Sequence, residues 1–310
     1  MPFQVTILGS NSALPAYGRH PSSQVLQAGE RLFMLDCGEG TQMRLAECHV
    51  RPGKLEAIFI SHLHGDHYFG LVGLLNSFHL LGRVRPLTVY APAELLPILE
   101  LQMRYSKGAL SYPLEVIPTH ANGLNTLFSD HQLEALSFPL NHGPTPTTGF
   151  LVRERAGERR IQGEKARSLG IAHADMERLR LGLDVPDAAG RIVRNQDLTL
   201  APWKPRSYAY CSDTAYLPSL REVVQGVDLL YHEATYAEAD AHRAADRFHS
   251  TARQAALLAA DSGVGRLLIG HFSSRYENLA PLLAEAQAVF PATELALEGQ
   301  VFEVEKREGE

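Results

Sequence analysis

Three histidines and one aspartate lie close together in the stretch Ser61-His62-Leu63-His64-Gly65-Asp66-His67. An apolar run precedes them, which predicts a buried strand that delivers these side chains to the loop at its C-terminal end. His62 and His64 are two residues apart, so they point to the same side of an extended backbone. Asp66 and His67 are adjacent and diverge, which favours a second ion for this pair. Imidazole and carboxylate groups without thiolate form a ligand set for Zn²⁺ or a similar borderline metal.

The alternative for this stretch is a purely structural role, because a single histidine is most often a surface residue or a hydrogen-bonded core residue. Four ligand-type side chains this close together would then repel one another and lose hydration without compensation. A bound metal removes both costs, so the spacing favours a metal site.

The segments that must position these residues alternate between strand and helix patterns, which is typical of an α/β protein. We expect the helix at 68–81 to place Phe69, Val72, Leu75 and Leu80 on its apolar face. The helix at 251–261 should be capped by Ser250 and Gly263. Strands are predicted at 3–8, 25–27, 31–35, 57–60, 87–90, 114–117, 132–140, 207–211, 227–230, 266–270 and 294–297, and helices at 41–48, 68–81, 92–104, 216–225, 251–261 and 276–289.

Further ligand-type residues follow the ends of other predicted strands. In α/β sheets, sites form in the crevice outside the C-terminal strand ends, so these residues should meet the 62–67 cluster there. Seven side chains are too many for one tetrahedral ion, and two ions can activate a water and clamp a phosphoryl group. Asp213 should bridge the ions, because a carboxylate has two oxygens to share. We assign His62, His64 and His142 to one ion, Asp66, His67 and His271 to the other, and Asp213 to both.

Asp36 ends a predicted strand and has two possible roles. It could accept a hydrogen bond from a ligand histidine and so orient that ring, or it could cap the helix at 41–48. The sequence does not choose between these roles.

Composition narrows the class of protein. With 310 residues and 45% hydrophobic residues, the chain fits one large domain or two small ones. We find no signal-peptide pattern and no apolar run of membrane-spanning length. The three cysteines are odd in number and lack CxxC spacing, which indicates a reducing compartment and a cytoplasmic location.

We treat residues 1–310 as a single domain with an insertion at 151–207. The insertion has many charged residues and few large apolar ones. It holds twelve basic and eight acidic residues, a net charge of +4, against a total of −6 for the chain. We expect an inserted arm with short helices near 164–169 and 174–181, followed much later by a frayed tail from Glu305. The negative total argues against a nucleic-acid partner, but a local positive patch is enough to bind RNA. The alternative is a solvated surface insertion.

Taken together, the motifs resemble the metallo-β-lactamase superfamily and, within it, the ribonuclease Z family of tRNA 3′-processing endonucleases. The first motif is specific to the superfamily, and the HEAT and HST motifs point to ribonuclease Z. The resemblance covers essentially the whole chain, although the arm lacks the Gly-Pro motif that the family's arm often carries. The motifs are His62-Leu-His-Gly-Asp-His67, Ser212-Asp213-Thr214, His232-Glu-Ala-Thr235, His249-Ser-Thr251 and His271-Phe-Ser-Ser-Arg-Tyr276.

This resemblance implies an αββα four-layer sandwich, two Zn²⁺ per subunit, a homodimer and an arm that grips precursor tRNA. It implies a zinc-dependent endoribonuclease that removes the 3′ trailer, leaving a 3′-OH on the tRNA and a 5′-phosphate on the trailer. Asp66 would accept a proton from the attacking water. We expect His249 to protonate the departing 3′ oxygen and Glu233 to orient or polarise His249; the alternative for these two is packing at a helix end.

Two other functions fit parts of the sequence. A different dinuclear metal hydrolase or phosphodiesterase of the same fold could act on a thioester or a small phosphodiester, but it would gain nothing from a basic arm. A non-catalytic RNA-binding relative would have no reason to retain every ligand. The sequence therefore favours the endoribonuclease.

Overall fold

The computed structural model describes residues 1–106 and 109–309. These residues form two units, and each is described by itself. The first unit holds residues 1–128, 135–152 and 207–304, whereas the arm unit holds 129–134, 153–206 and the C-terminal residues from 305.

The first unit is built on two seven-stranded sheets. In the first sheet, β1 to β3 pair antiparallel and β3 to β6 pair parallel. Its strands, in spatial order, are β18 (Val301–Glu303), β1 (Phe3–Gly9), β2 (Ser23–Ala28), β3 (Arg31–Cys37), β4 (Leu55–Phe59), β5 (Leu87–Ala91) and β6 (Leu114–Pro118).

The second sheet contains a run of parallel strands, β14 to β17. Because these strands are parallel, their C-terminal ends lie at one edge of the sheet, where polar side chains can meet. In spatial order its strands are β17 (Thr293–Leu295), β16 (Arg266–Gly270), β15 (Leu229–Glu233), β14 (Ser207–Cys211), β9 (Thr145–Glu154), β8 (Leu133–His142) and β7 (Asn125–Ser129).

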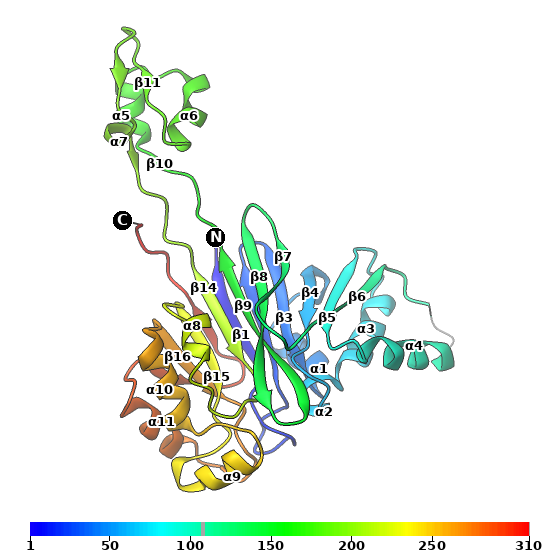
Figure 1. The fold of residues 1–310 in the computed structure, drawn as a ribbon. Helices are drawn as coiled ribbons and strands as arrows, with labels where there is room; N and C mark the ends of the chain where they lie inside the picture. Colours follow the sequence, from blue (N-terminus) through cyan, green and yellow to red (C-terminus); the bar gives the residue numbers. More distant parts are fainter. Residues whose placement is uncertain (107–108, 310) are drawn as a thin grey trace. The chain divides into compact units, whose positions relative to one another are not determined.

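The two sheets pack face to face, with helices on their outer faces (Figure 1). Phe59 of the first sheet contacts Phe150 of the second, with ring centroids 5.2 Å apart. Apolar clusters join each sheet to its own helices. This arrangement confirms the αββα sandwich. Helices α1 (Thr41–Glu47), α3 (Leu71–Leu80) and α4 (Leu95–Ser106) cover the first sheet, and α8 (Leu220–Val223), α10 (Ala252–Ser262) and α11 (Ala280–Gln287) cover the second.

Short helical segments complete the first unit. They are η1 (Pro52–Lys54), α2 (Gly65–Tyr68), η3 (Glu238–Asp240) and α9 (Ala241–Asp246). No helix in the described part of the chain is long and apolar enough to cross a membrane.

Several predicted boundaries were wrong. Of the segment at 68–81, Tyr68 ends α2 and residues 71–80 form α3. Leu75 is buried as expected, but Phe69 and Leu80 are exposed. The cap of α10 is Thr251, whose side chain accepts a hydrogen bond from the Gln254 amide, while the Gln254 side chain accepts one from Thr251. Ser250 instead donates its hydroxyl proton to a backbone carbonyl. The predicted helix at 216–225 shortens to α8, and strands β7, β9 and β18 were missed.

The arm unit contains the two expected short helices, α5 (Gly163–Ser168) and α6 (Met176–Arg180). A small core of buried apolar side chains, including Leu179 and Leu198, holds it together. The tail is not frayed, because the Lys204 amide donates to the Arg307 carbonyl at 2.9 Å. The unit also contains η2 (His173–Asp175), α7 (Asn195–Leu198) and two small sheets, β10 (Arg160–Ile161) with β13 (Thr199–Leu200) and β11 (Val185–Pro186) with β12 (Ile192–Val193).

Candidate metal centre and active site

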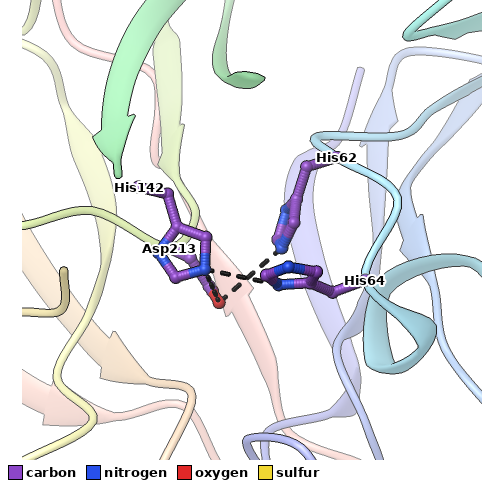
Figure 2. A group of neighbouring side chains, drawn as sticks. All are labelled: His62, His64, His142 and Asp213. Atoms are coloured by element: carbon purple, nitrogen blue, oxygen red, sulfur yellow. Dashed lines mark hydrogen bonds and ion pairs between the residues drawn. The ribbon is translucent and has the colours of Figure 1, made fainter. Parts of the chain in front are cut away.

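Four of the predicted ligands converge at one end of the two sheets (Figure 2). His62 and His64 come from the loop after β4, His142 ends β8, and Asp213 follows β14. Their ligand atoms all lie within 4.8 Å of one another. His62, His142 and Asp213 are buried, whereas His64 is exposed.

The remaining predicted ligands form a second group. Asp66 and His67 lie in α2, and His271 follows β16 with a φ of 58°. Ligand atoms of these three residues also lie within 4.8 Å of one another. The structure therefore brings together all of the side chains that the sequence assigned to metal, in the two predicted groups.

Asp213 lies between the two groups, and each of its oxygens faces one of them. Oδ2 is 3.8 Å from His62 Nε2 and 3.7 Å from His142 Nε2. Oδ1 is 3.3 Å from His67 Nε2 and 3.1 Å from His271 Nε2. A carboxylate placed in this way has the geometry of a bridging ligand.

Buried polar atoms without partners show that this donor set fits metal ions. His62 Nε2, His67 Nε2, His271 Nε2 and Asp213 Oδ1 are buried and have no hydrogen-bond partner among the described residues. Burying such atoms unpaired is costly. Imidazole and carboxylate donors at one site match the ligands of tetrahedral or five-coordinate Zn²⁺.

Electrostatics keep the carboxylates ionised. Burial favours the neutral acid of Asp213, but His271 and His67 hold the pKa of its carboxyl well below the usual range. Burial likewise opposes ionisation of Asp66, but His67 and His271 lower its pKa. Burial lowers the pKa of His62, and the neighbouring His67 lowers it further, so the His62 ring is neutral and free to act as a ligand.

Asp36 orients two of the ligand histidines from the end of β3. Its Oδ2 accepts hydrogen bonds from His67 Nδ1 at 2.8 Å, from the Ser61 hydroxyl at 2.9 Å and from the Tyr210 hydroxyl at 2.7 Å. The Ser61 hydroxyl in turn accepts from His62 Nδ1 at 3.0 Å. Both rings thus donate from Nδ1 and turn Nε2 toward the site. Of the two roles considered for Asp36, the structure shows the orienting one, since α1 has no side-chain cap.

Glu233 performs the corresponding role at the end of β15. Its Oε1 accepts from His249 Nδ1 at 2.9 Å, and its Oε2 accepts from the Thr235 hydroxyl at 2.8 Å. That hydroxyl accepts from His271 Nδ1 at 2.8 Å. Sequence reasoning paired Glu233 with His249 but missed its link to His271, for which the threonine of the HEAT motif was the only local signal.

His249 lies beside both ligand groups. Its ring centroid is 5.0 Å from that of His142 and 5.4 Å from that of His271. Burial disfavours the charged ring, but the Glu233 carboxylate outweighs burial and raises the pKa of His249 to about 9. A protonated imidazole held in this way can donate a proton at neutral pH. The carbonyl of the preceding residue, Phe248, accepts from His142 Nδ1 at 3.0 Å, another contact that the sequence did not reveal.

A cavity of about 400 Å³ opens beside His249. Ala13 also lines it, and the Ala13 amide donates to Asp66 Oδ2 at 2.7 Å. The cavity therefore lies next to His249, the expected proton donor, and next to the backbone amide that binds Asp66, the expected proton acceptor. Its lining residues are Ser12, Ala13, Leu14, Tyr236, Arg247, His249, Ser273, Ser274 and Arg275.

Comparison with known proteins places the sequence among close relatives. The chain is 42% identical over 301 residues to Ribonuclease Z of Parabacteroides distasonis, covering 96% of this chain and 97% of that protein. It is 39% identical over 308 residues to Ribonuclease Z of Cytophaga hutchinsonii, covering 99% and 98%. A family model described as Anti-Pycsar protein Apyc1 matches residues 3–143, which is less than half of the chain.

Solved structures share the fold. The short form of human tRNase Z superposes with a TM-score of 0.70 at 25% identity, covering 96% of this chain and 98% of that one. The metallo-β-lactamase fold protein YhfI from Bacillus subtilis has a TM-score of 0.69 at 19% identity, covering 98% and 100%.

Proposed function

The chain belongs to the ribonuclease Z family, whose members at about 40% identity match it over nearly its full length, and it is an endoribonuclease of tRNA 3′ processing; we propose that it removes the 3′ trailer of precursor tRNA with two zinc ions. The observation that carries this proposal is the placement of Asp213, whose two oxygens face two separate ligand groups. The buried and unpaired histidine nitrogens around it support the same assignment.

We assign the ions to the predicted residues. Bound there, the ions would activate a water and neutralise charge on the phosphoryl group. The ligands of one ion are His62, His64 and His142, those of the other are Asp66, His67 and His271, and Asp213 is shared.

We assign Asp66 and His249 to the two proton transfers of the reaction. Asp66 is ionised because its pKa is lowered, and it accepts a proton from the attacking water. His249 donates its proton to the departing 3′ oxygen, and Glu233 holds it in position through the 2.9 Å hydrogen bond to Nδ1. Attack in this sense leaves a 3′-OH on the tRNA and a 5′-phosphate on the trailer.

The arm at 151–207 is assigned to precursor tRNA binding. Its +4 charge contrasts with the negative remainder of the chain. Many of its arginines pair with carboxylates, for example Arg191 with Asp187. By contrast, Lys165 and Arg167 of α5 form no ion pair among the described residues, which leaves them for RNA phosphates. We also propose a homodimer, as the family resemblance implies, and a cytoplasmic location, which is consistent with three free cysteines.

Cleavage of a 3′-extended precursor tRNA by the zinc-loaded protein tests this function. We expect one main cut at the tRNA 3′ end, with a 3′-OH on the tRNA fragment and a 5′-phosphate on the trailer. A 2′,3′-cyclic phosphate would instead indicate attack by the ribose 2′-OH and would contradict the proposed water attack. Absence of cleavage, with a small phosphodiester still hydrolysed, would favour a different phosphodiesterase.

A further inference from the structure

Phe248 carries an exposed aromatic ring next to the proposed proton donor. It directly precedes His249, and its side chain is 38% exposed. Its carbonyl accepts a hydrogen bond from His142 Nδ1 at 3.0 Å, and the ring centroids of His142 and His249 lie 5.0 Å apart. The Phe248 backbone is therefore fixed between a predicted metal ligand and His249.

The backbone conformation of Phe248 is one that phenylalanine rarely adopts. Its φ of 55° lies in the left-handed region, where the Cβ atom of any residue other than glycine is crowded. Strained backbone of this kind persists where the surrounding structure holds it, and it is concentrated at functional sites. Glycine would adopt this conformation without strain, so the presence of a ring here points to a role for the ring.

The position of the ring is set by Gly143, which directly follows His142. A Cβ atom at residue 143 would lie 2.5 Å from both Cδ2 and Cε2 of Phe248, which is well inside the separation of carbon atoms in contact. The lack of a side chain at Gly143 thus makes room for the ring. Arg247 and His249, on either side of Phe248, both line the cavity described above. The ring is therefore held next to the metal centre and the cavity, and part of its surface is open to solvent.

We propose that the Phe248 ring stacks on the base of the last tRNA nucleotide, which is the nucleotide that keeps the departing O3′ atom. His249 protonates this oxygen in the proposed cleavage, so the nucleotide that carries it lies beside His249 and hence beside Phe248. An aromatic ring stacks on any base, because every base has a π-face. The contact orients the nucleotide next to the cut without selecting its identity. The inference rests on the proposed function, and in particular on protonation of O3′ by His249.

Paired changes in the protein and in the RNA test this contact. Phe248→Gly removes the ring but keeps a residue that favours the left-handed backbone, so its metal content should match that of the wild type. An abasic nucleotide at the last tRNA position removes the base. With full-length, zinc-loaded protein and 3′-extended precursor tRNA, we expect either change alone to lower kcat/KM about 5- to 150-fold, the range for the loss of one stacked base. Both changes together should cost no more than one of them.

Separate outcomes would overturn the proposal. Losses that multiply when both changes are made would show that the ring and the base act independently. Full activity of Phe248→Leu would show that apolar bulk is enough and that no π-face is needed, whereas Phe248→Tyr should restore the wild-type kcat/KM. Tyr105→Ala removes another exposed aromatic side chain, near the end of α4, and should leave kcat/KM for the intact precursor unchanged. An abasic first trailer nucleotide is the control in the RNA, and its effect should multiply with that of Phe248→Gly.

End-group analysis of the same samples separates this inference from the proposed function. Products with a 3′-OH on the tRNA, together with losses that multiply at the last tRNA position, would overturn the stacking contact alone. A 2′,3′-cyclic phosphate on the tRNA would contradict the proposed function itself.

Discussion

Substituting Asp36 by asparagine tests whether a buried carboxylate sets the protonation of the metal-binding histidines. Asp36 is fully buried and receives hydrogen bonds from His67, Ser61 and Tyr210. Asparagine has the same shape but replaces one acceptor oxygen with a donor. Whichever way the amide turns, its NH₂ group meets an existing donor, either the Ser61 backbone amide at Oδ1 or the donors that converge on Oδ2.

The magnitude follows from these contacts. Loss of an outer-shell partner of a metal ligand typically weakens metal affinity 10- to 100-fold, which corresponds to about 1.4–2.7 kcal/mol. Replacing charge-assisted hydrogen bonds by neutral ones, with one donor left unpaired, should also lower the free energy of unfolding by roughly 2–4 kcal/mol. We therefore expect Asp36→Asn to fold but to release metal to a chelator at a lower chelator concentration than the wild type does.

Asp228→Asn is the matched control. Asp228 is also buried and accepts hydrogen bonds from the Ser207 amide and hydroxyl, both at 2.9 Å. Ser207 begins β14, whereas Asp213 follows the opposite end of that strand. Substitution of Asp228 should lower the free energy of unfolding without changing metal affinity. If chelator competition gave equal affinities for Asp36→Asn and the wild type, the orienting role of Asp36 would be refuted.

Three further experiments test separate parts of the site and the arm. Asp213→Ala should lose more metal than His142→Ala, measured by elemental analysis, because Asp213 faces both ligand groups and His142 only one; retention of both ions by Asp213→Ala would exclude bridging. His249→Ala should keep its metal but cleave precursor tRNA about 10²- to 10⁴-fold more slowly, and loss of metal would instead make His249 a ligand. Replacing Lys165 and Arg167 together by alanine should raise the KM for precursor tRNA and reduce the salt slope of binding by roughly one per lost contact. The exposed pair Arg51 and Lys54 of the first unit provides the control, and equal effects of the two double substitutions would argue against RNA binding by the arm.

The convergence of the candidate metal ligands could be predicted because part of their signal is local. Closely spaced ligands after an apolar run lie at a strand end, and Asp213 and His271 follow strands of the parallel run β14 to β17, whose C-terminal ends lie at one edge of the sheet. His142 ends β8, which lies outside that run. The separation of Asp66 and His67 from His62 and His64 was predicted correctly, but the expected divergence of Asp66 and His67 was wrong, because both lie in α2 and their ligand atoms converge with that of His271.

The contacts that orient the histidines could not be predicted in the same way. Tyr210 and Asp36 are separated by 174 residues, and His142 and Phe248 by 106, so these hydrogen bonds depend on how the sheets pack. The predicted cap of α10 was wrong because two adjacent residues, Ser250 and Thr251, are both good N-cap residues. The structure uses Thr251 because the Ser250 hydroxyl donates to Thr214 across the fold. The tail was expected to fray because it is polar, but its backbone pairs with residues of the arm unit.

Metal titration of the metal-free protein tests the central claim most directly. Zinc would be added in known equivalents, and bound metal and precursor tRNA cleavage would be measured on the same samples. The two ligand groups that share Asp213 predict that binding saturates at about two equivalents per chain and that cleavage reaches its maximum only there. Full cleavage at one equivalent, with no second ion bound, would contradict a dinuclear centre.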